Sequence, residues 1–147
     1  MTENREPEAQ RWAERAEADL RAAGHQIGGA RRRVIELLAK QPCALTALEM
    51  DRRLPAGRAS IYRALEHLEG LHLVQRIDVG GDAAGYERVD AGHHHHIVCE
   101  RCGRLEPFSD DALEQTIGAI SRATSFEVST HDVTLRGACP DCAAAGA

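Results

Sequence analysis

The sequence predicts an α+β fold in which helices and a pair of strands precede a smaller mixed segment. Three observations lead to this prediction. Helical periodicity covers most of residues 8–69, two strand-like runs follow at Leu73–Val79 and Gly85–Val89, and two Cys-x-x-Cys pairs flank the last part of the chain.

The length and composition limit the class of protein. The chain has 147 residues, which suits one ordinary domain or two small ones, and 43% of them are hydrophobic, which excludes a wholly disordered chain. No run of 18 apolar residues is present, and the N-terminus lacks the basic and apolar regions of a signal peptide. We therefore expect a cytoplasmic protein, in which five reduced cysteines indicate metal or redox chemistry before disulfides.

The charge of the chain is unevenly distributed. The formal net charge is −5, but residues 21–63 carry nine basic residues against three acidic ones. A basic region of this kind is typical of a surface that contacts phosphate groups, although a solvated helix face has the same composition. Five aromatic residues are too few for the stacking platform of a single-strand binder.

Residues 8–23 and residues 30–40 are predicted to form the first two helices. The first range is rich in Ala, Glu and Arg, contains neither Gly nor Pro, and is followed by a glycine. The second range places Val, Ile and Leu three and four residues apart and is followed by a proline. Its first turn carries Arg31, Arg32 and Arg33, which oppose the helix macrodipole and are explained more easily by nearby phosphates.

The next two helices are predicted to form a helix-turn-helix. Thr46-Ala-Leu-Glu49 has the pattern of a capping box and opens a short helix to Leu54. A Pro-Ala-Gly turn separates this helix from residues 58–69, which have one apolar face. The polar side chains that this second helix directs to solvent suit a helix that enters the major groove, and they are Arg58, Ser60, Tyr62, Arg63 and His67.

The two strand-like runs complete the order of a winged helix. They are separated by a stretch that begins Gly80-Gly81-Asp82, which is typical of a hairpin. A helix-turn-helix followed by a hairpin favours a winged-helix DNA-binding domain. The alternative is a small helical bundle with an attached hairpin.

The pairs Cys99-x-x-Cys102 and Cys139-x-x-Cys142 have the spacing of metal-binding knuckles. Two such pairs complete the tetrahedral coordination of zinc, and four sulfur ligands leave no open position, so the site is predicted to be structural. The alternatives are a redox dithiol, which needs only one pair, and chance.

The 36 residues between the two pairs are too many for a simple zinc ribbon. This spacer is predicted to hold a strand near Leu105–Phe108, a helix capped by Ser109 or Asp110 that runs to Arg122, and a strand from Phe126 to Leu135.

Four consecutive histidines, His93 to His96, precede the first knuckle. In an extended strand His93 and His95 share one face and His94 and His96 the other, so the strand can serve two metal sites. Imidazole suits zinc, iron(II), nickel and copper, and a solvated histidine patch is the alternative. Further candidate ligands are Cys43, His72, Glu87, Glu114 and His131, whereas His25 and His67 are interpreted as surface residues.

These motifs together resemble the ferric uptake regulator family of metal-responsive bacterial repressors over roughly residues 15–142. The matching residues are Ala23-Gly24 followed by Arg31, the helix Ala59-Ser-Ile-Tyr-Arg-Ala-Leu65, Tyr86-Glu87, the histidine run before Cys99-x-x-Cys-Gly103, Phe108-Ser-Asp-Asp111, Glu114, and His131 ahead of Gly137-x-Cys-x-x-Cys142.

The resemblance implies a winged-helix DNA-binding domain with the start of a hinge at residues 1–90, and a C-terminal α/β dimerisation and metal-binding domain at residues 91–147. Members of this family bind operator DNA as metal-loaded homodimers. We therefore expect a zinc- or iron-sensing repressor of metal-uptake or metal-homeostasis genes rather than an enzyme. Its cofactors would be a structural Zn²⁺ and a regulatory divalent metal, Zn²⁺ or Fe²⁺.

The resemblance also assigns residues to three metal sites and to a DNA-binding surface. The structural zinc site matches Cys99, Cys102, Cys139 and Cys142. A second site in the dimerisation domain matches His93, His95, Glu114 and His131, and the regulatory site at the hinge matches Glu87, His94 and His96. Tyr62 and Arg63 match positions on the DNA-reading helix. With them we expect Arg58 and Ser60 to contact bases, and Arg31, Arg32 and Arg33 to contact phosphates.

The chain departs from the family pattern at several positions that bear on the metal and the DNA. Cys43 stands one place from a regulatory ligand that is often histidine, and it is either a ligand that favours a thiophilic metal or a small core residue. Many iron-type members have aspartate at the position of His95, and histidine there is common in zinc- and nickel-type members. Glu87, by contrast, resembles the iron type. Gln26 and Gly28 replace a basic residue and a helix-capping threonine, which weakens the expected minor-groove contact.

Two other functions remain open at this point. A peroxide sensor of the same superfamily would use iron(II) at the hinge to oxidise a histidine ligand, and mass analysis of His93 to His96 after peroxide treatment would identify it. A zinc hydrolase would need an open coordination position and a glutamate base, but no H-E-x-x-H motif is present and the winged helix would be unexplained.

Overall fold

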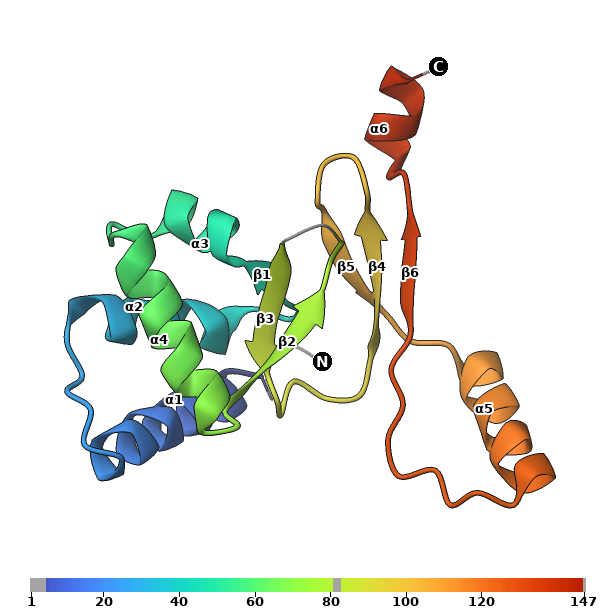
Figure 1. Cartoon of the computed structure of the whole chain (residues 1–147), viewed down its shortest axis with the longest axis horizontal. Helices are drawn as coiled ribbons and strands as arrows, with labels where there is room; N and C mark the ends of the chain where they lie inside the picture. Colours follow the sequence, from blue (N-terminus) through green and yellow to red (C-terminus); the bar gives the residue numbers. More distant parts are fainter. Residues whose placement is uncertain (1–4, 81–82, 147) are drawn as a thin grey trace. The chain divides into compact units, whose positions relative to one another are not determined.

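The computed structural model describes residues 5–80 and 83–146, which separate into two compact units with the boundary between Gly92 and His93 (Figure 1). Each unit combines helices with a three-stranded sheet, so the predicted α+β class is confirmed. None of the described helices is long and apolar enough to cross a membrane.

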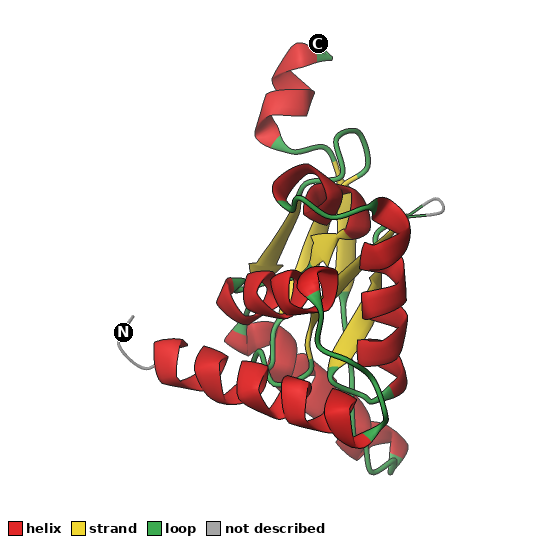
Figure 2. Cartoon of the chain, turned by 90° about the vertical axis from the view of Figure 1, so that its left-hand side faces the viewer, coloured by secondary structure: helices red, strands yellow, loops and turns green. Residues whose placement is uncertain are grey.

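Four helices make up most of the first unit. They are α1 (Arg5–Ala22), α2 (Gly29–Lys40), α3 (Ala47–Arg53) and α4 (Arg58–Gly70). Figure 2 shows α1 as the long helix next to the N-terminus; it packs against α2 and α4, and α4 also packs against α3. The apolar faces of these helices enclose a core that includes Trp12, Leu38, Met50 and Leu65.

The predicted helix boundaries are close to the observed ones, and their differences have local causes. α1 begins before residue 8 because Pro7 lies in its first turn, where a backbone N–H has no helical partner to lose. The predicted capping box of α3 is confirmed, since Thr46 Oγ1 accepts from the Glu49 N–H at 3.2 Å and the Glu49 carboxylate accepts from the Thr46 N–H at 2.8 Å.

The sheet of the first unit has the order β1-β3-β2 and is antiparallel throughout. Its strands are β1 (Leu45–Thr46), β2 (Val74–Asp78) and β3 (Ala84–Arg88). The two-residue β1 has no periodicity to reveal it in the sequence. It approaches β3 closely because position 85 is glycine, where a Cβ would lie 3.1 Å from the Ala44 Cβ. Gly81 and Asp82 of the predicted hairpin turn lie outside the described residues.

Trp12 connects α1 to the start of the hairpin by a hydrogen bond. Its side chain is 2% exposed, and its indole N–H donates to the Leu73 carbonyl oxygen at 3.1 Å. The Arg88 guanidinium lies 5.8 Å from the centre of the same ring. The hairpin that follows α4 is therefore anchored to the first helix as well as to the core.

The second unit contains a sheet with the order β5-β4-β6 and two helices. The strands are β4 (His95–Cys99), β5 (Leu105–Phe108) and β6 (Thr134–Gly137), and the helices are α5 (Asp111–Thr124) and α6 (Pro140–Ala145). β4 pairs with β5 in antiparallel fashion and with β6 in parallel fashion. The parallel pairing needs a crossover connection, which α5 and the loop after it provide.

One prediction for the spacer is corrected, and a further helix follows the spacer. The last strand begins at Thr134 rather than Phe126, because β4 offers pairing partners only from His96 onward and Phe126 is 74% exposed. The short helix α6 was not expected, although a proline at its first position is a known start signal. Helix α5 is capped as predicted, since the Asp110 carboxylate accepts from the Leu113 N–H at 2.8 Å.

Candidate metal centres and nucleic-acid surface

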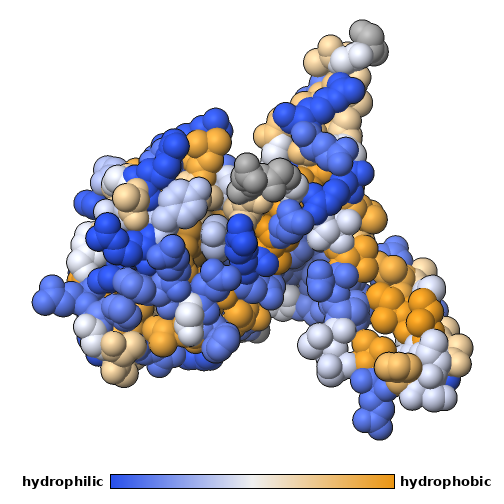
Figure 3. Space-filling view, in the orientation of Figure 1, coloured by the Kyte–Doolittle hydropathy of each residue, from blue (hydrophilic) through white to orange (hydrophobic). Residues whose placement is uncertain are grey.

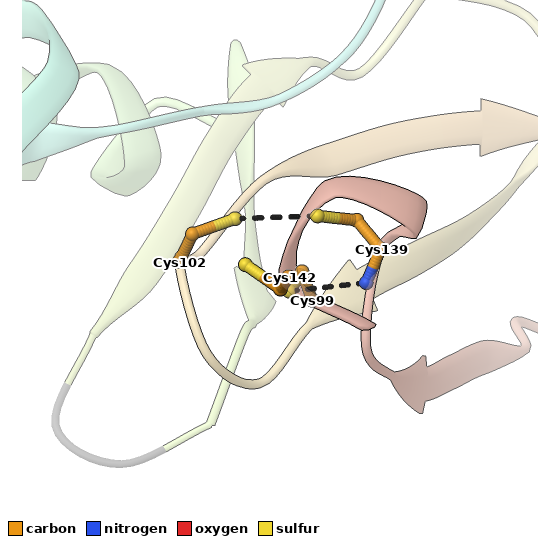
Figure 4. A group of neighbouring side chains, drawn as sticks. All are labelled: Cys99, Cys102, Cys139 and Cys142. Carbon is orange, nitrogen blue, oxygen red and sulfur yellow. Dashed lines mark hydrogen bonds between the residues drawn. The ribbon is translucent and has the colours of Figure 1, made fainter. Parts of the chain in front are cut away.

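The four cysteines of the two knuckles converge on one point (Figure 4). Cys99 ends β4, Cys102 follows it in a tight loop, and Cys139 and Cys142 lie at the start of α6. All four sulfur atoms lie within 4.8 Å of one another, and the sulfurs of Cys102 and Cys139 are 3.8 Å apart.

The backbone that carries the knuckles fixes their geometry. The Gly103 N–H donates to the Cys99 carbonyl oxygen at 2.9 Å, in a turn that requires a φ of +76° at Gly103. The Glu100 N–H donates to the Gly137 carbonyl oxygen at 2.8 Å, which extends the pairing of β4 and β6 and brings the second knuckle to the first.

The electrostatics of this group suit a dication. The Cys139 N–H donates to the Cys99 sulfur at 3.3 Å and, with the loop backbone, lowers the pKa of Cys99 to about 6. The neighbouring sulfurs of Cys139 and Cys102 instead raise the pKa of Cys142 to about 12. The first thiolate therefore forms easily and the last one resists ionisation until a cation offsets the negative charge. Four sulfur donors at this spacing fit a closed, tetrahedral zinc site.

A second group of ligand atoms lies around Glu114 in the first turn of α5. Its carboxylate oxygens lie 3.2 Å from His93 Nε2, 2.7 Å from His95 Nε2 and 2.9 Å from His131 Nε2. His95 is fully buried, and its hydrogen bond is the largest cause that lowers the pKa of Glu114, followed by His93 and His131. Three imidazoles and one carboxylate form a donor set that suits zinc or iron(II).

The orientation of His95 depends on a contact that sequence reasoning missed. The Val133 N–H donates to His95 Nδ1 at 3.2 Å, while Nε2 faces Glu114. Because Nδ1 accepts this hydrogen bond, the ring proton lies on Nε2, which donates to the Glu114 carboxylate, and the two contacts together fix the orientation of the ring. Only the parallel register of β4 and β6 brings Val133 to this position, so no local sequence signal could have found it.

The remaining candidate ligands lie in two pairs, one in each unit. In the second unit the rings of His94 and His96 are 4.8 Å apart. In the first unit Cys43 and Glu87 are both buried, and their sulfur and carboxylate oxygen lie within 4.8 Å of each other. His72 is exposed in the turn after α4 and, among the described residues, joins none of the groups that could hold a metal.

The exposed side of α4 carries the expected polar residues. Tyr62 is 45% exposed and Arg63 is exposed, whereas Ser60 is half-buried. Arg58 forms an ion pair with Asp51 of α3 at 3.0 Å, a partner that its spacing of seven residues did not suggest. A hollow of about 170 Å³ lies between α4 and the start of α2, and Arg31, Ser60 and Arg63 all line it.

Each of the three consecutive arginines of α2 contacts a neighbour within the first unit. Arg31 donates to the Gln26 carbonyl oxygen at 2.7 Å, and Arg33 donates to the Pro55 carbonyl oxygen at 3.3 Å. Arg32 lies 3.6 Å from the Glu17 carboxylate. The N-terminus of α2 has no side-chain cap and no acidic residue in its first turn, so its N–H groups and these arginines give one positive surface.

His67 lies at the edge of this surface. Its ring stacks on His25 with the centroids 4.0 Å apart, and its Nδ1 lies 2.9 Å from an Arg31 nitrogen. Desolvation is the largest cause that lowers the pKa of His67 below 6.5, followed by His25 and Arg31, and Arg63 acts in the same direction while Glu66 opposes it.

This depressed pKa predicts a loss of stability on acidification. Below about pH 6.5 the unfolded chain takes up a proton at this position before the folded chain does, so His67 disfavours the folded state increasingly as the pH falls. Above that pH the penalty is absent. In urea denaturation, His67→Gln should therefore lose less free energy of unfolding than the wild type between about pH 7.5 and about pH 5.5. An identical pH dependence in both proteins would contradict the shift.

The sequence of this chain is similar to those of known proteins of one family. The model of the ferric uptake regulator family matches residues 22–136. The ferric uptake regulation protein of Legionella pneumophila is 37% identical over 86 residues, which cover 58% of this chain and 63% of the relative. The protein of the same name from Neisseria gonorrhoeae is 28% identical over 135 residues, which cover 88% of this chain and 94% of the relative. The match with the first of these relatives thus spans less than two thirds of its length.

Solved structures agree with the family match. The ferric uptake regulator of Vibrio cholerae has a TM-score of 0.71 at 29% identity, covering 84% of this chain and 98% of that one. The ferric uptake regulator of Helicobacter pylori has a TM-score of 0.79 at 21% identity, covering 92% and 93%, and supports the fold alone. Since the family model covers most of the sequence and these structures share its fold, the chain belongs to the ferric uptake regulator family.

Proposed function

We propose that the protein is a metal-dependent transcriptional repressor that binds operator DNA as a homodimer and controls genes of metal uptake or homeostasis in the cytoplasm. The observation that carries this proposal is the combination within one chain of a helix-turn-helix, whose second helix exposes Tyr62 and Arg63, and a separate unit that gathers metal ligands. An enzymatic function would not explain the exposed second helix of the helix-turn-helix. DNA binding alone would not explain the groups of metal ligands.

An apolar face of the second unit supports the homodimer. α5 has no buried residue, and hydrophobic side chains gather on the surface over this helix (Figure 3). Ile120 on α5 is 55% exposed. Ile97 and Leu135 are register partners on β4 and β6, and both are more than 40% exposed. Apolar side chains exposed on both the helix and the sheet of one small unit are typical of an interface, and a second copy of the chain would cover them by two-fold symmetry.

The metal roles follow from the donor sets. We assign a structural zinc ion to the four cysteines and a second metal to His93, His95, Glu114 and His131. Both groups lie wholly within the second unit. Metal bound there stabilises the unit that forms the dimer.

The regulatory site is assigned to Glu87, His94 and His96, with Cys43 as a further ligand. One divalent ion that takes ligands from both units would restrict the orientations of the DNA-binding unit, and it acts as an allosteric ligand because it favours that restricted state. In this state the two reading helices of the dimer match successive major grooves, roughly 34–36 Å apart.

The position of Cys43 favours zinc as the regulatory metal. A site that combined a cysteine sulfur with Glu87 and two imidazoles would have a soft and mixed donor set, which suits zinc better than iron(II). The same sulfur makes the peroxide-sensing alternative the weaker candidate, since that function depends on iron(II).

The test of this function compares two arginine variants on two kinds of DNA. An operator is first selected from a random duplex pool with the metal-loaded protein. Arg63→Ala should then weaken binding more on the operator than on random duplex, by about 1–3 kcal/mol, because a base contact discriminates between sequences. Arg32→Ala should weaken binding to both duplexes equally and lower the slope of log affinity against log salt by about one unit.

Fluorescence anisotropy over a salt series measures both effects. The Arg32–Glu17 ion pair lies at the surface, with Arg32 exposed and Glu17 half-buried, and such a pair contributes little to stability, so Arg32→Ala serves as a folded control. Equal losses on both duplexes would make Arg63 a phosphate contact. Failure of the metal-loaded wild type to bind any duplex would refute the proposed function itself.

A further inference from the structure

The carboxylate of Glu87 is held by a partner on the neighbouring strand. Gln75 on β2 and Glu87 on β3 are directly opposite each other in the antiparallel pair, so their side chains point to the same face. The Gln75 amide Nε2 donates to Glu87 Oε1 at 2.6 Å. Both residues belong to the first unit, so this contact is a property of the DNA-binding unit alone.

The chemistry of the pair requires this direction of donation. Gln75 presents its nitrogen to Glu87, which is the arrangement that an ionised carboxylate needs because it only accepts hydrogen bonds. Glu87 is 2% exposed, and a carboxylate buried to this extent needs donors that replace water. A short hydrogen bond to an ionised acceptor is stronger than one between neutral groups, and it restricts rotation of the carboxylate.

The neighbouring position on the same strand shows how selective this arrangement is. Arg76 faces the opposite side of the sheet, where Tyr86 is its register partner on β3. An arginine at position 75 would place a permanent positive charge beside Glu87 and would compete with a dication for the carboxylate. A neutral amide orients the carboxylate and leaves its negative charge available.

We propose that Gln75 is a positioning residue that holds the Glu87 carboxylate in the orientation it needs as a regulatory metal ligand. This inference rests on the proposed function of Glu87. The amide fixes Oε1, and the planar geometry of the carboxylate then sets the direction of its other oxygen. The metal affinity of the site therefore depends on a residue that contacts no metal.

The experiment measures Co²⁺ binding by visible absorption to the full-length protein that carries zinc only in its four-cysteine site. A His131→Ala background weakens the other exchangeable site, so that the spectrum reports the regulatory site. Gln75→Leu removes the amide but preserves the size of the side chain. It should weaken Co²⁺ affinity by about 10–100-fold, the usual effect of losing an outer hydrogen-bond partner, and should change the ligand-field absorption bands.

Two controls separate positioning from a general effect on the strand. Arg76→Leu alters the other face of β2 and should leave Co²⁺ affinity unchanged. Before Co²⁺ is added, the circular dichroism of Gln75→Leu at the assay temperature should match that of the background, although its thermal midpoint should fall because the buried carboxylate loses a donor. An equal loss of affinity in both leucine variants, or an unchanged affinity and spectrum in Gln75→Leu, would overturn the inference.

Glu87→Ala distinguishes failure of this inference from failure of the regulatory-site assignment. If Glu87→Ala loses Co²⁺ affinity and Gln75→Leu does not, only the positioning role is wrong. If Glu87→Ala binds Co²⁺ as the background does, Glu87 is no ligand, and the regulatory site proposed above fails together with the inference that depends on it.

Discussion

The Cys102→Ser variant is expected to lose its structural zinc ion and, with it, the folded second unit. Among the described residues the hydrophobic core cluster lies between Trp12 and Tyr86, entirely in the first unit. The second unit buries few apolar side chains, of which Val98 is the largest. Structural zinc sites bind with about 10–16 kcal/mol in small peptides, comparable to the whole stability of a domain at about 5–15 kcal/mol. Small domains that lack a sufficient core depend on such a site.

Zinc content, size-exclusion chromatography and circular dichroism measure this outcome. Cys102→Ser should contain less than one zinc ion per chain and elute as a monomer or an aggregate, while the helical signal of the first unit persists. Cys43→Ser makes the same substitution at a cysteine outside the tetrad, and it should keep the four-cysteine zinc ion and the dimer even if it weakens the regulatory site. A Cys102→Ser protein that remains a zinc-containing dimer would show that the four-cysteine assignment is wrong.

The His96→Ala variant is expected to lose the response of DNA binding to added metal while keeping its fold. The four-cysteine group does not include His96, so the variant should retain its structural zinc and remain dimeric. Its weak, salt-sensitive DNA binding should also persist. The gain in operator affinity on adding metal, which we expect to be about 5–150-fold in the wild type, should disappear.

Gel-shift titration with and without Zn²⁺ or Fe²⁺ measures this gain. Cys43→Ala identifies the remaining ligand, since a loss equal to that of His96→Ala places the thiolate in the sensor and an unchanged response places it in the core. If His96→Ala responds to metal as the wild type does, regulation belongs to the group around Glu114, and the hinge mechanism is refuted.

Local chemistry made the helices of the first unit predictable. The capping box at Thr46 and the Pro-Ala-Gly turn act within a few residues, so their signals are complete in the sequence. The strand expected from Phe126 fails for the opposite reason. A strand forms only where a neighbouring strand supplies hydrogen bonds. The length and position of β4 therefore determine where β6 begins.

The same distinction applies to the candidate site. Cysteine pairs and alternating histidines are visible because metal coordination demands particular residue types at short spacings. The residues that orient these ligands need not be of a particular type or lie at a short spacing from them. Gln75 and Val133 act through strand register, one by an amide and the other by its backbone N–H, and register is a property of the folded sheet.

The exposed apolar face of the second unit has a consequence for the amount of protein in a cell. If this face is buried only when two chains meet, assembly is second order, and the fraction of chains competent to bind an operator depends on total chain concentration as well as on metal. Half-assembly at nanomolar concentrations needs a dissociation constant near that value, or about 12 kcal/mol from this face. Expression level would then set the metal concentration at which repression begins, so a change in gene dosage would retune the sensor without altering any ligand.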